Sequence, residues 1–218
     1  MIRPHSSINF KFNEESKIWL STHIQEIFKD FDETFPETGG PIFNKPDKTT
    51  SVNFQSSPPA LQVKKFLKEL GLTNTYVQMF VYKIISESLR KENPHIDTPR
   101  LTPLPGRFNV LVYGNERSKM HWWNKDIHDS AIQHVDIPNF GKRWQIIGNS
   151  TKERLNLLGQ SDYSADTLSK IDQTGDFVRT DIVHSIERDG DRRLIVSVRI
   201  HHPWEEIYEK VNQALTNE

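Results

Sequence analysis

The chain has 218 residues, of which 35% are hydrophobic and 26% are charged. This composition supports one domain with a hydrophobic core and excludes a disordered chain. The formal net charge is -1, so no overall field draws the protein to nucleic acid or to an anionic membrane surface. Cysteine is absent, which excludes disulfides and thiolate zinc sites and leaves His, Asp, Glu or water to hold any metal. No segment has the apolar length of a signal peptide or a membrane span, so we expect a cytoplasmic protein.

The first 75 residues are expected to form a helical extension. Residues 13–32 predict a helix that Asn13 caps, because apolar side chains recur on one face at Leu20, Ile24, Ile27, Phe28 and Phe31. A second helix is expected to begin after a capping Ser57, with Pro58 in its first turn, and to end at Gly71. Residues 33–56 are rich in Pro, Gly, Thr and Asn, which predicts a loop with one short strand near residues 51–54.

The pattern then changes to strands and turns. Residues 76–85 predict a strand that is covered on both faces. Further strands are expected at residues 108–113, 119–123, 131–137, 143–147, 177–187 and 193–200. Residues 148–176 predict a long loop with a short helix, and helical spacing returns after Pro203. The order predicts a single α+β domain, residues 1–218, with a jelly-roll core at 76–200 and a C-terminal helix at 201–218.

The segment from Phe177 to Ile200 reads as a β-hairpin with Asp189-Gly190 as its turn. Alternation places His184 on one arm and Arg193 on the other, with Ile195, Ser197 and Arg199 on the same side as Arg193. Such a hairpin would direct a histidine and an arginine toward one small ligand. An arginine can bind a carboxylate through two parallel hydrogen bonds, and Arg199 is the second candidate for that role.

A His-x-Asp pair, His95-Ile96-Asp97, lies upstream. Its two ends project to the same side of an extended strand, so both can reach one ion. Two histidines and one carboxylate are the ligands of non-haem Fe(II) oxygenases and leave three metal positions open. His95 and Asp97 with His184 are therefore the predicted metal ligands.

A second pair, His134-Val135-Asp136, is the alternative and lies nearer to His184 in the sequence. Against both metal hypotheses, a His-x-Asp pair is often part of a surface loop. His184 can also be a buried histidine whose hydrogen bonds are satisfied within the core.

The residues His95-Ile96-Asp97, then Arg107-Phe108-Asn109-Val110-Leu111-Val112, then His184 and Arg193 resemble the Fe(II)/2-oxoglutarate-dependent dioxygenases, in particular their short bacterial and phage members. The resemblance spans residues 76–200. It implies a double-stranded β-helix in which His95, Asp97 and His184 bind Fe(II), while Arg193 binds the far carboxylate of 2-oxoglutarate. Tyr76, Tyr82 and Asn109 are further candidates to line the pocket.

The activity that this resemblance implies is hydroxylation of a small molecule or an amino-acid side chain. Nothing in the sequence names the substrate or the oligomeric state. Two alternatives stay open: a cupin-like metal-binding protein with isomerase-type or no catalytic activity, and a jelly-roll binding protein without metal.

Overall fold

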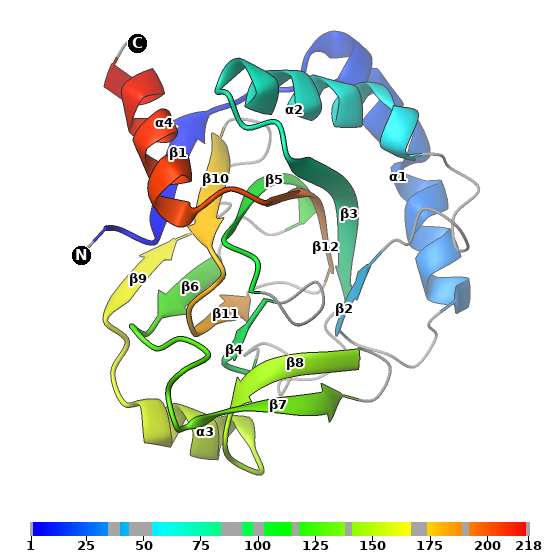
Figure 1. The fold of residues 1–218 in the computed structure, drawn as a ribbon. Coiled ribbons are helices and arrows are strands. Elements are labelled where there is room, and N and C mark those ends of the chain that lie inside the picture. The colour runs from blue at the N-terminus through cyan, green and yellow to red at the C-terminus, as the bar shows by residue number, and fades with distance from the viewer. Residues whose placement is uncertain are drawn as a thin grey trace.

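The computed structural model describes residues 2–34, 40–43, 54–83, 93–97, 103–114, 118–137, 141–166, 174–188 and 192–216. Its centre consists of two six-stranded antiparallel sheets (Figure 1). The major sheet has the order β1 (His5–Asn9), β10 (Thr174–Arg179), β5 (Gly106–Gly114), β12 (Arg192–Ile200), β3 (Thr75–Lys83) and β2 (Gly40–Phe43). The minor sheet has the order β7 (Ile132–Ile137), β8 (Gly141–Ile146), β4 (His95–Ile96), β11 (His184–Arg188), β6 (Ser118–Trp122) and β9 (Tyr163–Asp166).

The chain passes repeatedly from one sheet to the other. Strands β3, β5, β10 and β12 belong to the major sheet, whereas β4, β6, β9 and β11 belong to the minor sheet. These eight strands form the jelly roll, or double-stranded β-helix, that the sequence predicts. Strands β7 and β8 are an insertion between β6 and β9 that extends the minor sheet beyond β4.

Helices cover the outer face of the major sheet. Helices α1 (Glu14–Thr34) and α2 (Pro58–Glu69) lie along it, and α4 (Trp204–Thr216) lies beside β1 (Figure 1). On β12, Leu194, Val196, Val198 and Ile200 belong to the hydrophobic core formed with these helices. The alternate residues of β12, beginning with Arg193, therefore face the space between the two sheets. The short helix α3 (Thr151–Leu158) packs on the other side of the molecule, against the minor sheet.

The predicted helix boundaries are confirmed in outline, with one correction at a cap. The Asn13 side chain accepts a hydrogen bond from the Ser16 backbone N–H at 2.9 Å, as a capping residue does. Ser57, however, makes no side-chain capping bond, because its hydroxyl donates to the Phe54 carbonyl in the 3-10 turn Phe54–Ser56. Gly71 ends α2 with a φ of 74°, a conformation that glycine adopts without a steric penalty.

The predicted hairpin between His184 and Arg193 is wrong. Strand β11 pairs with β4 and β6, whereas β12 pairs with β3 and β5, so the two arms lie in different sheets. The predicted strand at 177–187 is also two strands, because the chain leaves the major sheet after β10 and enters the minor sheet at β11. The crossing segment bonds to other loops: the Val183 N–H donates to the Lys125 carbonyl and the Val183 carbonyl accepts from the Trp123 N–H. The Asp189-Gly190 turn lies outside the described residues.

Four strands lie outside the strand ranges predicted from the pattern, although an extended backbone was expected at the His-x-Asp pair. Strands β1 and β2 come from the N-terminal segment and extend the major sheet at its two edges, while β4 and β9 are short additions to the minor sheet. The ends of two predicted strands, residues 84–85 and 51–53, lie outside the described residues. Across the described ranges, no helix combines the length and apolar character that crossing a membrane requires.

Candidate metal centre

The pairing of β4 with β11 brings the two ends of the predicted site together. His95 and His184 are direct register partners, and their ring centroids lie 4.6 Å apart. Asp97 follows β4 immediately, and its backbone N–H donates to the Thr180 carbonyl at 3.0 Å, which fixes the chain beyond the strand. One ligand atom from each of His95, Asp97 and His184 lies within 4.8 Å of the others. Within the described part of the chain, this is the group of side chains that has the make-up and spacing to hold a metal ion.

The hydrogen bonds of the two imidazoles determine which ring nitrogen faces the centre. His95 Nδ1 lies 2.7 Å from the Asn93 carbonyl oxygen, and His184 Nδ1 lies 2.9 Å from the Ile182 carbonyl oxygen. A carbonyl oxygen only accepts, so Nδ1 carries the proton in both rings. The lone pair of each neutral imidazole is then on Nε2, and His95 Nε2 lies 3.3 Å from Asp97 Oδ1. This backbone support of the opposite nitrogen is the usual arrangement of metal-binding histidines.

Asp97 is held by an arginine that the sequence reasoning did not assign to the site. The Arg107 Nε–H donates to Asp97 Oδ2 at 2.5 Å, and both side chains are almost buried, at 9% and 12% exposure. Burial by itself raises the pKa of Asp97, but the Arg107 guanidinium beside the carboxylate holds this pKa well below its usual range. The carboxylate is therefore ionised at neutral pH, as a metal ligand has to be.

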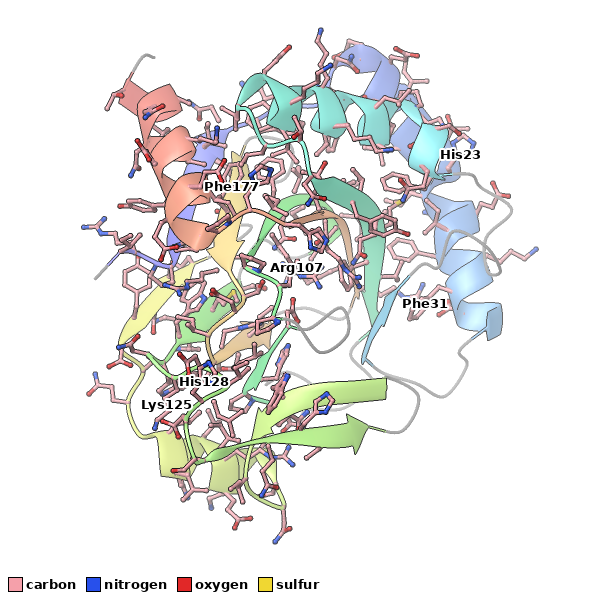
Figure 2. All side chains as sticks on the ribbon, viewed as in Figure 1. His23, Phe31, Arg107, Lys125, His128 and Phe177 are labelled. Carbon is pink, nitrogen blue, oxygen red and sulfur yellow. The ribbon has the colours of Figure 1, made fainter. Side chains whose placement is uncertain are left out.

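Arg107 lies near the middle of the molecule (Figure 2). It is on β5, where Phe108 and Val110 face the helices and belong to the hydrophobic core. Alternation turns Arg107 and Asn109 toward the minor sheet. The sequence contains a signal for this buried ion pair. An arginine that alternates with buried apolar residues in a central strand needs a partner inside the protein.

The inner face of the major sheet carries a row of polar side chains. Ser7, Asp176, Asn109, Ser197 and Gln78 are successive register partners across five strands. Asp176, Ser197 and Gln78 are at most 3% exposed. The Gln78 amide nitrogen has no hydrogen-bond partner among the described residues. An inner sheet face with such a polar row offers hydrogen-bonding groups to a polar ligand, whereas the inner face of an ordinary sandwich carries apolar side chains.

Arg193 is also buried between the sheets, at 1% exposure. Its Nη1 donates to the hydroxyl of Ser118 on β6, so this side chain connects the major and minor sheets. Ser118 lies four residues along β6 from Trp122, the register partner of His184. At about 3.3 Å per residue, the Arg193 contact is roughly 13 Å along the sheet from His184.

The alternative histidine is not part of this group. His134 lies on β7, which β8 separates from β4, and its ring packs on Trp144 with centroids 4.8 Å apart. The side chain of Asp136 lies outside the described residues. Among the other pocket candidates, Asn109 is half-buried on the inner face, whereas Tyr76 is 37% exposed near the start of β3. The Tyr82 side chain is likewise outside the described residues.

Comparisons with known proteins identify the fold and nothing finer. No family model matches the chain, and no curated protein matches it. The structure of EvdMO1 matches with a TM-score of 0.52 at 9% identity, over 93% of this chain and 48% of that chain. A prolyl-4-hydroxylase of Pseudomonas putida matches with a TM-score of 0.45 at 9% identity, over 91% of this chain and 92% of that one. The viral collagen prolyl hydroxylase of Paramecium Bursaria Chlorella virus-1, solved with 2OG, matches with a TM-score of 0.40 at 8% identity, over 91% of this chain and 95% of that one.

At this identity the match to EvdMO1 shows a common fold alone. The strand order described above is that of a double-stranded β-helix, so the chain has the fold that the resemblance in its sequence predicts.

Proposed function

We propose that the protein is an Fe(II)- and 2-oxoglutarate-dependent dioxygenase that hydroxylates a small molecule or an amino-acid side chain. The observation that supports this most directly is the pair of fixed imidazole tautomers. Both Nδ1 atoms donate to backbone carbonyls, so Nε2 is the nitrogen of each ring that could bind an ion beside the ionised Asp97 carboxylate. The three ligand atoms lie within 4.8 Å of one another, which is close enough for one ion to contact all of them.

The donor set fits Fe(II). Two imidazole nitrogens and one carboxylate oxygen bind this ion and leave positions for other ligands, and neutral histidines need not lose a proton to do so. Within the proposal, His95, Asp97 and His184 hold the metal. When bound, Fe(II) would supply the redox chemistry by which dioxygen converts 2-oxoglutarate to succinate and carbon dioxide while one oxygen atom enters a substrate C–H bond.

The protein's own side chains would orient the co-substrate. Arg193 carries its charge between the sheets, bonded to Ser118 on the strand that pairs with the strand of His184, and would bind the far carboxylate of a five-carbon diacid whose other end is bound to the metal. A buried guanidinium binds a carboxylate with two parallel hydrogen bonds, and this fixes orientation as well as affinity. The polar row that includes Asn109, Ser197 and Gln78 offers amide and hydroxyl groups to the remainder of the ligand or to the substrate.

The test is succinate release from 2-oxoglutarate by protein supplied with Fe(II), ascorbate and oxygen, with the His184→Ala variant as its matched control. We expect slow substrate-independent turnover in the wild type and none in the variant. Arg193→Ala should raise the concentration of 2-oxoglutarate needed for half-maximal turnover by at least about tenfold, since the lost contact is charge-assisted.

The same measurements address the alternatives. A cupin-like protein with other chemistry would bind metal through His95, Asp97 and His184, yet Arg193→Ala would leave its ligand binding unchanged. A jelly-roll protein without metal would show no difference between wild type and His184→Ala in metal content after purification without chelator.

A further inference from the structure

The Arg107 guanidinium is held in place by three different contacts. Its Nε–H donates to Asp97 Oδ2 at 2.5 Å, and its Nη1 donates to the Ser197 hydroxyl at 3.3 Å. Its central carbon lies 5.1 Å from the centroid of the Phe80 ring, within the range of a cation–π contact. Strands β5, β12 and β3, which carry Arg107, Ser197 and Phe80, are neighbours in the middle of the major sheet. The guanidinium is therefore fixed to a rigid part of the fold.

This fixed guanidinium decides how Asp97 can meet a cation. Oδ2 accepts the hydrogen bond from Arg107, whereas Oδ1 lies 3.3 Å from His95 Nε2. An ion bound by both oxygens would also lie beside Oδ2, the oxygen that the positively charged Arg107 guanidinium already contacts, so charge repulsion disfavours this arrangement relative to binding by Oδ1 alone. A carboxylate presented by one oxygen occupies one position at the ion, and a carboxylate presented by both oxygens occupies two.

Arg107 also changes the charge of the centre. Two neutral imidazoles, the Asp97 carboxylate and the Arg107 guanidinium together carry no net charge. A divalent ion bound there keeps its full charge of +2, which matches the charge of a dicarboxylate. Without Arg107 the same ion would be offset by one negative charge, and an anionic ligand would be attracted less strongly.

We propose that Arg107 is a positioning residue: by holding Oδ2 it presents Asp97 to the metal through Oδ1 alone, and by its charge it favours an anionic ligand at the metal. The proposal rests on the proposed metal centre. It concerns a side chain on β5, separate from Arg193 and from the three ligands.

The experiment uses Co(II) in place of Fe(II) and N-oxalylglycine as an inert analogue of 2-oxoglutarate. For wild type, Arg107→Gln and Arg107→Lys, the Co(II) absorption spectrum and the Kd of the analogue are measured on the metal-loaded protein. Arg192→Gln is the matched control, because Arg192 also bonds to an aspartate, Asp32 at 2.7 Å, but at the periphery. Far-UV circular dichroism checks that each variant is folded.

We expect Arg107→Gln to change the Co(II) spectrum and to weaken the analogue about tenfold or more, in line with other residues that support metal ligands. Arg107→Lys should recover part of the affinity for the analogue, because lysine restores the positive charge. Its Co(II) spectrum should stay altered, because an ammonium group does not reproduce the planar arrangement of N–H donors of a guanidinium. Arg192→Gln should match the wild type in both measurements.

If wild-type protein bound neither Co(II) nor the analogue, the proposed function itself would fail. If wild type bound both, and Arg107→Gln gave the same spectrum and the same Kd, the positioning role alone would be overturned. Should Arg107→Gln fail to fold, Ser197→Ala serves as the milder variant, because it removes the Nη1 contact, and its Co(II) spectrum decides, since Ser197 could also contact the analogue directly. A smaller change of the Co(II) spectrum in the same direction supports the role, and a spectrum equal to that of the wild type rejects it.

Discussion

Removal of Arg107 from the metal-free protein should be strongly destabilising. The Arg107→Met variant keeps an unbranched stem in the core but leaves the Asp97 carboxylate without its cation in a site that is 12% exposed. Breaking a buried ion pair by removal of one partner costs about 3–5 kcal/mol. The Coulomb energy gives a similar figure, about 4 kcal/mol for charges about 4 Å apart at an effective dielectric constant of about 20. We therefore expect the free energy of unfolding to fall by about 3–5 kcal/mol.

The assay is urea unfolding in the presence of chelator, followed by the fluorescence of the buried tryptophans Trp122, Trp123 and Trp204. The Asp97→Asn/Arg107→Met double variant buries neither charge, so it should be more stable than Arg107→Met alone. Arg192→Met removes a partly exposed ion pair and should cost at most about 1 kcal/mol. A loss below about 1 kcal/mol for Arg107→Met, or a double variant no more stable than the single one, would refute the reasoning.

Three further predictions follow from the same contacts. Gly175→Ala places a methyl carbon 2.1 Å from the buried Phe108 ring, so we expect a loss of about 1–3 kcal/mol, measured as a lower Tm. Mn(II) at about 100 times its Kd should stabilise the wild type by about 2.7 kcal/mol but leave the stability of His184→Ala unchanged. If Mn(II) did not raise the Tm of the wild type, the proposed metal centre would be wrong. His134→Ala should retain the Mn(II)-dependent rise in Tm, and loss of that rise would restore the alternative ligand pair.

The helices and most strands could be predicted because their signals are local. The apolar stripe from Leu20 to Phe31 and the glycine at position 71 act within a few residues, and the structure places α1 and the end of α2 where these patterns indicate. The jelly roll followed from the number and order of the strands. The short strand β9 has too few residues to show a period, and β4 was expected only as the extended backbone that carries the His-x-Asp pair.

Sheet membership could not be predicted, because it depends on partners far away in the sequence. The two arms of the expected hairpin show the same alternation and the same Asp-Gly turn whether they pair with each other or with other strands. The structure separates β11 from β12 and brings His184 beside His95 instead. Arg193 still lies between the two sheets, because the inner faces of both sheets of a jelly roll are directed toward each other.

The candidate site was accessible from the sequence only as residue types and spacings. The spacing of His95 and Asp97 indicates that both can face one ion, and the structure brings His184 to them. The ion pair between Asp97 and Arg107 was missed. Asp97 follows β4 of the minor sheet and Arg107 lies on β5 of the major sheet, so no periodicity within one strand connects them.

The facing pair of His95 and His184 has a consequence for folding kinetics. β4 and β11 share a single register pair, which is His95 with His184. Strands of both sheets lie between these two residues in the sequence. An ion that requires both imidazoles has nothing to bind until the last strands have docked, because early folding intermediates favour contacts close in sequence. A bound cation should therefore prolong the lifetime of the finished barrel, with little effect on how quickly the barrel forms.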